Sequence, residues 1–130
     1  MGDYTIKRID EMEAAFLGAF KRARAELGVE AFGIQVIDLP RNLAEYPEHD
    51  HADSGQEEVF VVMRGAGEIE VDGERLAIDP ETLIRVGPEA KRKLWPGDQG
   101  MRVLAVGGTP GAAYEPPDVT KLGEPDPMAR

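Results

Sequence analysis

The chain has 130 residues, no cysteine and a formal net charge of −10 from 25 acidic and 15 basic residues. This length fits one domain that buries its own core, and the lack of cysteine excludes disulfides, thiolate metal ligands and a cysteine nucleophile. An acidic surface repels phosphate backbones, so no nucleic-acid partner is expected. The first ten residues have no apolar signal core, and the longest apolar run, residues 59–63, is too short to span a bilayer. A cytoplasmic protein without membrane contact is therefore expected.

One amphipathic helix is predicted over residues 10–27. Its apolar side chains recur at spacings of three and four, at Met12, Phe16, Phe20, Ala23 and Leu27. Asp10 is a suitable N-cap with Glu13 three residues later, and Gly28 can adopt the left-handed conformation that ends a helix. We expect this helix to pack on its own domain.

Short runs of strand character follow, separated by turn signals. They are residues 31–39, 58–64, 68–72, 75–78, 83–86, 91–95 and 101–106. Asp72-Gly73 predicts a hairpin, because a type I′ turn needs positive φ at both central residues. Strands at this regular spacing favour a sandwich or barrel. The expected division is an N-terminal helical extension over residues 1–30, a barrel over 31–107 and a Pro-rich C-terminal tail over 108–130.

Two histidines, His49 and His51, are the only ones in the chain. They are two positions apart, so an extended chain points both imidazoles to the same side. Glu57 and Glu58 follow a short loop, and a carboxylate there can be held opposite the histidines. Two histidines and one carboxylate form the facial set of non-haem iron and related divalent sites. The competing interpretation is that residues 47–53 form only a polar surface loop.

The series His49, His51, Glu58, six residues and Gly65 resembles the first signature motif of the cupin family, and residues 67–74 are also typical of it. The resemblance covers about residues 32–107. It implies an all-β fold, the double-stranded β-helix or jelly-roll barrel, to which this chain adds one N-terminal α-helix. In that family, the two histidines, the glutamate and a third histidine bind a divalent metal inside the barrel. The resemblance thus implies His49, His51 and Glu58 as metal ligands.

The first motif departs from the family pattern in its loop. Six residues separate His51 from Glu58, where cupins usually have three or four, so the loop carries an insertion. Glu58 fits the spacing to the motif's glycine and, by strand alternation, shares a face with Phe60. Glu57 falls on the opposite face. We therefore predict that Glu58 is the inward carboxylate.

The second motif departs further, because Arg92 stands where the third histidine belongs. Arginine stays protonated and has no free lone pair, so it cannot be a metal ligand. In one outcome, the other three residues still bind Fe, Mn, Ni or Zn and Arg92 holds an anion nearby. In a second outcome, the metal is absent and Arg92 pairs with Glu58. In a third, the strand is shifted and residues 91–93 form a solvated basic patch.

Arg92, Gln35 and Phe60 are the candidate ligand-binding residues. Gln35 is a lone polar residue in an apolar run, and either hydrogen-bonds inside the barrel or occupies an ordinary exposed strand position. The expected function is a barrel that binds a small molecule in a pocket built on four residues, His49, His51, Glu58 and Arg92. The alternative is a divalent-metal-dependent enzyme of the dioxygenase or isomerase type. By analogy with cupins, we expect a homodimer.

Overall fold

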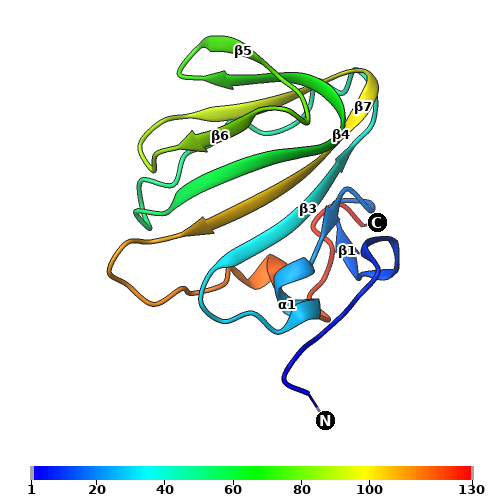
Figure 1. The fold of residues 1–130 in the computed structure, drawn as a ribbon, viewed down its shortest axis with the longest axis vertical. Coiled ribbons are helices and arrows are strands. Elements are labelled where there is room, and N and C mark those ends of the chain that lie inside the picture. The colour runs from blue at the N-terminus through cyan, green and yellow to red at the C-terminus, as the bar shows by residue number, and fades with distance from the viewer. Residues whose placement is uncertain (1, 130) are drawn as a thin grey trace.

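The computed structural model describes residues 2–129 and consists mainly of antiparallel strands (Figure 1). The strands are β1 (Ala14–Ala15), β2 (Phe20–Lys21), β3 (Gly33–Leu39), β4 (Glu57–Val71), β5 (Glu74–Ile78), β6 (Leu83–Val86) and β7 (Arg92–Gly108). One α-helix, α1 (Ala23–Leu27), and two 3-10 turns, Ile9–Glu11 and Asp118–Thr120, complete the described elements. Figure 1 shows the strands in one curved sheet, with α1 and β1 gathered beside β3.

The two long strands, β4 and β7, organise the sheet. They pair with each other along their whole lengths, from Glu57 opposite Gly108 to Val71 opposite Arg92. The first half of β4 also pairs with β6, and its second half pairs with β5. The second half of β7 pairs in turn with β3, which continues the sheet to β2 and β1. Each long strand therefore has different neighbours along its two halves, and β4 and β7 together connect the β3 side of the sheet to β5 and β6.

The long pair bends at glycines. The register shifts between Val62 and Arg64 and again between Gly65 and Gly67. A Cβ atom at either glycine would lie 2.2 Å from a backbone oxygen of β7. Only glycine allows the two strands to approach this closely where they turn. The predicted strand breaks at these glycines and at residues 96–98 are wrong, because the chain bends there without leaving the sheet.

The core lies on the inner face of the bent sheet. Its buried members include Ile37, Phe60, Val62, Ile69, Leu94 and Val103. The hairpin predicted at Asp72-Gly73 is confirmed, since the two residues have φ of 48° and 88° and join β4 to β5. The predicted strands 83–86 and 101–106 also lie within observed strands.

The predicted helix over residues 10–27 is wrong in extent, because only Ala23–Leu27 is α-helical. Phe16 and Leu17 both have φ of 56°, and they turn the chain between β1 and β2. The Asp126 carboxylate, from the other end of the chain, accepts hydrogen bonds at 2.8 Å from both of their N–H groups. These long-range contacts override the local helical pattern. The predicted stop is confirmed: Gly28 has φ of 79° and caps the helix.

The C-terminal segment after β7 lies beside α1 and β1 (Figure 1). Arg22 holds it there, with its side chain only 2% exposed. The guanidinium donates to the carbonyl oxygens of Val119 and Glu124, each at 2.9 Å, and to the Glu13 carboxylate at 2.7 Å. One buried cation thus ties the two ends of the chain together. We call this group the terminal clasp.

None of the helices within residues 2–129 combines the length and hydropathy that a bilayer crossing requires.

Candidate metal centre

The two histidines lie on an extended segment that joins the edge of the sheet. The His49 N–H donates to the Arg92 carbonyl oxygen at 3.0 Å, and the Arg92 N–H donates to the His49 carbonyl oxygen at 2.8 Å. Two residues further on, the His51 N–H donates to the Pro88 carbonyl oxygen at 2.8 Å. As expected from the sequence, the two side chains point to the same side of this extended segment, and their imidazole centroids lie 5.0 Å apart.

The tautomer of His49 is set by its backbone neighbour. Nδ1 of His49 lies 3.1 Å from the Pro47 carbonyl oxygen, which can only accept a hydrogen bond. Nδ1 is therefore the donor in this contact, which leaves Nε2 as the nitrogen that can face a metal ion. Metal-binding histidines are oriented by contacts of this kind on the second nitrogen.

Glu58 completes the group from the first half of β4. Its Oε1 lies 3.5 Å from Nε2 of His51, and the donor atoms of His49, His51 and Glu58 all lie within 4.8 Å of one another. Glu57 points the other way and pairs with Arg85 on the outer face at 2.8 Å. The prediction that Glu58 is the inward carboxylate is confirmed.

The inserted loop closes on itself, so the extra residues do not separate His51 from Glu58. The carbonyl oxygen of His51 accepts hydrogen bonds from the N–H groups of Ser54 and Gly55, at 3.2 and 2.9 Å. Gly55 has φ of 70°, which favours glycine. The side chain of Thr109 then fastens the turn to the end of β7 through the Ser54 carbonyl oxygen at 3.0 Å.

Arg92 lies inside the barrel with 0% of its surface exposed. Its Nη2 donates to the Gly87 carbonyl oxygen at 2.7 Å, whereas Nε and Nη1 are buried and have no hydrogen-bond partner within residues 2–129. The solvated basic patch is therefore wrong. The alternative in which Arg92 pairs with Glu58 is also wrong, since no ion pair joins the two side chains in the described chain.

The other two candidate ligand-binding residues lie in one row across the inner face. Gln35 pairs with Ala105 of β7, and Ala105 pairs with Phe60 of β4. Gln35 is 7% exposed, so the exposed strand position is wrong, and both its amide atoms are without a partner among the described residues. Phe60 is 1% exposed and belongs to the apolar core, and its contact with a ligand stays a prediction.

Two tyrosines that the sequence did not single out lie beside these residues. The ring of Tyr46 is 6.0 Å from that of His49. Burial raises the pKa of Tyr46, the Glu58 carboxylate raises it further, and the Arg92 guanidinium opposes them. Tyr46 is therefore a neutral hydroxyl near both charges. Its position in a loop between predicted strands carries no periodic signal.

Tyr114 comes from the C-terminal segment. A Cβ atom on Gly33 would lie 2.7 Å from the Tyr114 hydroxyl, so a side chain at this position would displace the ring. Burial raises the pKa of Tyr114, the Arg24 guanidinium lowers it, and the Glu58 carboxylate raises it. Gly33 and Glu58 both pair with Gly107, so the segment covers the end of the sheet that carries the glutamate.

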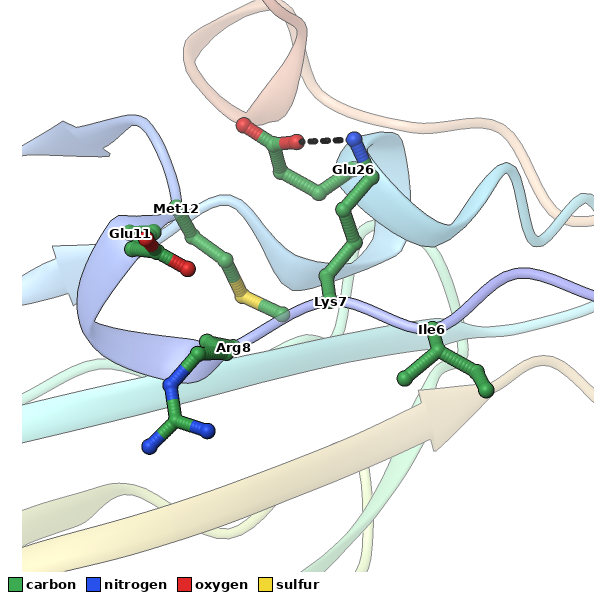
Figure 2. A pocket seen from close by; sticks show the side chains of 6 residues that line it. All are labelled: Ile6, Lys7, Arg8, Glu11, Met12 and Glu26. Atoms are coloured by element: carbon green, nitrogen blue, oxygen red, sulfur yellow. Dashed lines mark ion pairs between the residues drawn. The ribbon is translucent and has the colours of Figure 1, made fainter.

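A surface pocket elsewhere contains none of these residues. Figure 2 shows it between the N-terminal segment and α1, with Lys7 and Glu26 paired across it at 3.5 Å. Its lining residues are Ile6, Lys7, Arg8, Glu11, Met12 and Glu26.

No protein-family model matches the chain, and no curated protein matches its sequence. Solved structures do match. A cupin protein from Bacteroides fragilis is 18% identical with a TM-score of 0.69, covering 90% of this chain and 93% of its own. An RmlC-like cupin from Desulfovibrio desulfuricans is 22% identical with a TM-score of 0.54, covering 61% and 73%. A cupin 2 conserved barrel domain protein from Salinispora arenicola is 20% identical with a TM-score of 0.53, covering 61% and 64%.

These likenesses define the class: the chain has the cupin fold. The prediction of an all-β jelly-roll barrel with one N-terminal α-helix is thereby confirmed. The His49, His51 and Glu58 group sits in a barrel of this class, and its donor atoms are close enough together to hold a metal ion.

Proposed function

We propose that this chain binds a divalent metal ion through His49, His51 and Glu58 and a small molecule beside it inside the barrel. The observation that carries the proposal is a set of buried polar atoms without partners in the described chain. These atoms are His51 Nε2, Glu58 Oε1, and Nε and Nη1 of Arg92. Buried polar groups are nearly always satisfied by protein, water or a bound group, so several such atoms gathered in one place support a bound ion or ligand there.

The chemistry of the donors fits a divalent metal. His49 has a free Nε2, and His51 and Glu58 offer a nitrogen and an oxygen at mutual distances that one ion can bridge. Imidazole and carboxylate suit Zn, Fe, Mn and Ni, and three protein ligands leave positions for water or a bound molecule. A metal ion in such a site acts as a Lewis acid toward an oxygen of that molecule.

The chain's own residues define the surroundings of that molecule. Arg92 supplies a fixed positive charge, Gln35 an amide whose two polar atoms have no partner within the described chain, and Tyr46 a neutral hydroxyl. His51 keeps 26% of its side-chain surface exposed, so the group is open to solvent on one side. A dioxygenase- or isomerase-type activity, the homodimer and the cytoplasmic location stay predictions.

Elemental analysis of untagged protein tests the metal site. After incubation with Mn, Fe, Ni or Zn and removal of excess ion, the wild type should hold one equivalent. The double variant His49→Ala, His51→Ala should hold none, and circular dichroism should show that it remains folded. A wild type that takes up none of the four ions would overturn the proposal.

A further inference from the structure

Burying a guanidinium without a carboxylate partner makes the free energy of folding less favourable, because a charge removed from water needs a compensating partner. The Arg92 side chain is in this situation, with 0% exposure and one hydrogen bond among the described residues, to the Gly87 carbonyl oxygen. By contrast, the other two arginines that are buried within residues 2–129 each contact a carboxylate: Arg22 contacts Glu13, and Arg102 contacts Asp38 and Asp10. Arg92 is therefore the buried cation for which the folded chain provides no anion within residues 2–129.

We infer that Arg92 binds a carboxylate group of the small molecule, and that this carboxylate and the metal ion strengthen each other's binding. The inference rests on the proposed function, whose metal site it uses. The Arg92 backbone exchanges both hydrogen bonds with His49, so the two side chains leave the same face of adjacent strands. Arg92 and Glu58 also both act on the Tyr46 hydroxyl, which places both charges near the same ring.

The charge balance gives the sign of the coupling. Glu58 and Arg92 carry opposite charges, so the site without metal is neutral overall. A divalent ion brings two positive charges next to a buried cation that cannot lose its proton. Tyr46 offers no compensation because its hydroxyl stays neutral. An anion on Arg92 offsets part of the repulsion, so the metal binds more tightly once the anion is present and the anion gains equally from the metal.

The geometry favours a carboxylate among anions. A guanidinium has five N–H donors, and two of them are on Nη2. The Gly87 carbonyl oxygen takes one of these, so one planar edge of two donors, formed by Nη2 with either Nε or Nη1, remains complete. A planar two-oxygen group matches that edge. A phosphate has further oxygens that need donors of their own, whereas both oxygens of a carboxylate are satisfied by the two donors of this edge.

Titration of Mn²⁺ into the metal-free wild type, followed by isothermal calorimetry, measures the coupling directly. One series contains millimolar sodium acetate and the other contains sodium chloride at equal ionic strength. Acetate should lower the Kd for Mn²⁺ by about fivefold or more, the lower end of typical coupling between sites. Phosphate serves as the competing anion, and the proposal requires it to have a smaller effect than acetate.

Variants assign the effect to Arg92. Arg92→Gln should bind Mn²⁺ at least as tightly as the wild type in chloride and should lose the acetate effect. Arg92→Lys keeps the charge without the two-donor edge. Its Kd for Mn²⁺ in chloride should therefore stay as high as that of the wild type, and acetate should lower this Kd much less than it does in the wild type. Arg75→Gln is the matched control, because Arg75 is 46% exposed and lies 4.1 Å from the ring of Trp95. This control should behave as the wild type.

The outcomes separate the two proposals. Mn²⁺ binding that acetate leaves unchanged in the wild type overturns the carboxylate inference alone. An acetate effect that persists in Arg92→Gln overturns it as well. A wild type that binds no metal overturns the proposed function and, with it, this coupling. Should Arg92→Gln fail to fold, the wild-type series and Arg92→Lys still show whether acetate strengthens Mn²⁺ binding through the two-donor edge of Arg92.

Discussion

His49 and Arg92 exchange both of their backbone hydrogen bonds, at 3.0 and 2.8 Å, across the edge of the sheet. This pairing places a potential metal ligand next to a cation that cannot be one. Because paired residues on antiparallel strands share a face, a change in either side chain is felt by the other.

Glu58→Gln should weaken metal binding by roughly tenfold or more, since a neutral amide replaces the anionic ligand. Glu57→Gln is a matched control. It makes the same change one residue away on the outer face, where Glu57 pairs with Arg85. Calorimetric titration with Mn²⁺ compares the two variants. Equal losses in both would show that the effect is one of overall charge, and Glu58 would then not be a ligand.

Gly67→Ala should destabilise the fold by about 2–3 kcal/mol, because the new Cβ atom overlaps a backbone oxygen that cannot move aside. The Cβ atom would lie 2.2 Å from the Trp95 carbonyl oxygen. Gly73→Ala provides the comparison, because nothing lies within 4 Å of its added Cβ atom. Its loss of stability should come from the positive φ alone, about 1–2 kcal/mol. Urea unfolding measures both. A Gly67→Ala protein as stable as the wild type would contradict the close approach at the bend.

Arg22→Met should release the C-terminal segment and destabilise the protein by roughly 2–3 kcal/mol, since charged hydrogen bonds to two carbonyl oxygens and a carboxylate are lost. Hydrogen exchange should increase first over residues 109–129. Lys121→Met, on the same segment, removes an exposed cation that pairs with Asp118 three residues away and should leave exchange unchanged. Uniform exchange across the barrel in Arg22→Met would mean that the clasp is not a separate unit.

Acid should loosen the terminal clasp before the barrel unfolds. The N–H groups of Leu17, Met128 and Phe16 hold the pKa of Asp126 below its usual range, and the Arg22 guanidinium and the Gly123 N–H do the same for Glu13. Carboxyls with a lowered folded-state pKa stabilise the fold at pH values above their ordinary pKa. Their contribution falls as the pH drops through that value toward the folded one.

Hydrogen exchange of residues 109–129 at pH 6 and near pH 3, corrected for intrinsic rates, measures this effect. The double variant Asp126→Asn, Glu13→Gln should be less protected at pH 6 and should show a smaller change on acidification. Protection of the segment that rises as the pH falls would contradict the sign of both shifts.

The sequence was most informative where the signal is local. Alternation along a strand decides that Glu58 faces inward and Glu57 outward, and the spacing of the motif places Arg92 inside the barrel. The helix over residues 10–27 failed because Asp126, more than a hundred residues away, stabilises a turn at Phe16 that no local pattern encodes. Tyr114 was missed for the same reason, since a tail packed by distant contacts has no periodicity to reveal its position.

The central claim is that His49, His51 and Glu58 hold one divalent ion inside the barrel. Anomalous diffraction at the absorption edge of the bound metal, from crystals of untagged protein grown with Mn²⁺ or Zn²⁺, tests it most directly. The account predicts one strong peak within coordination distance of both histidines and the glutamate. A metal peak elsewhere, or none in this group at saturating metal, would contradict it.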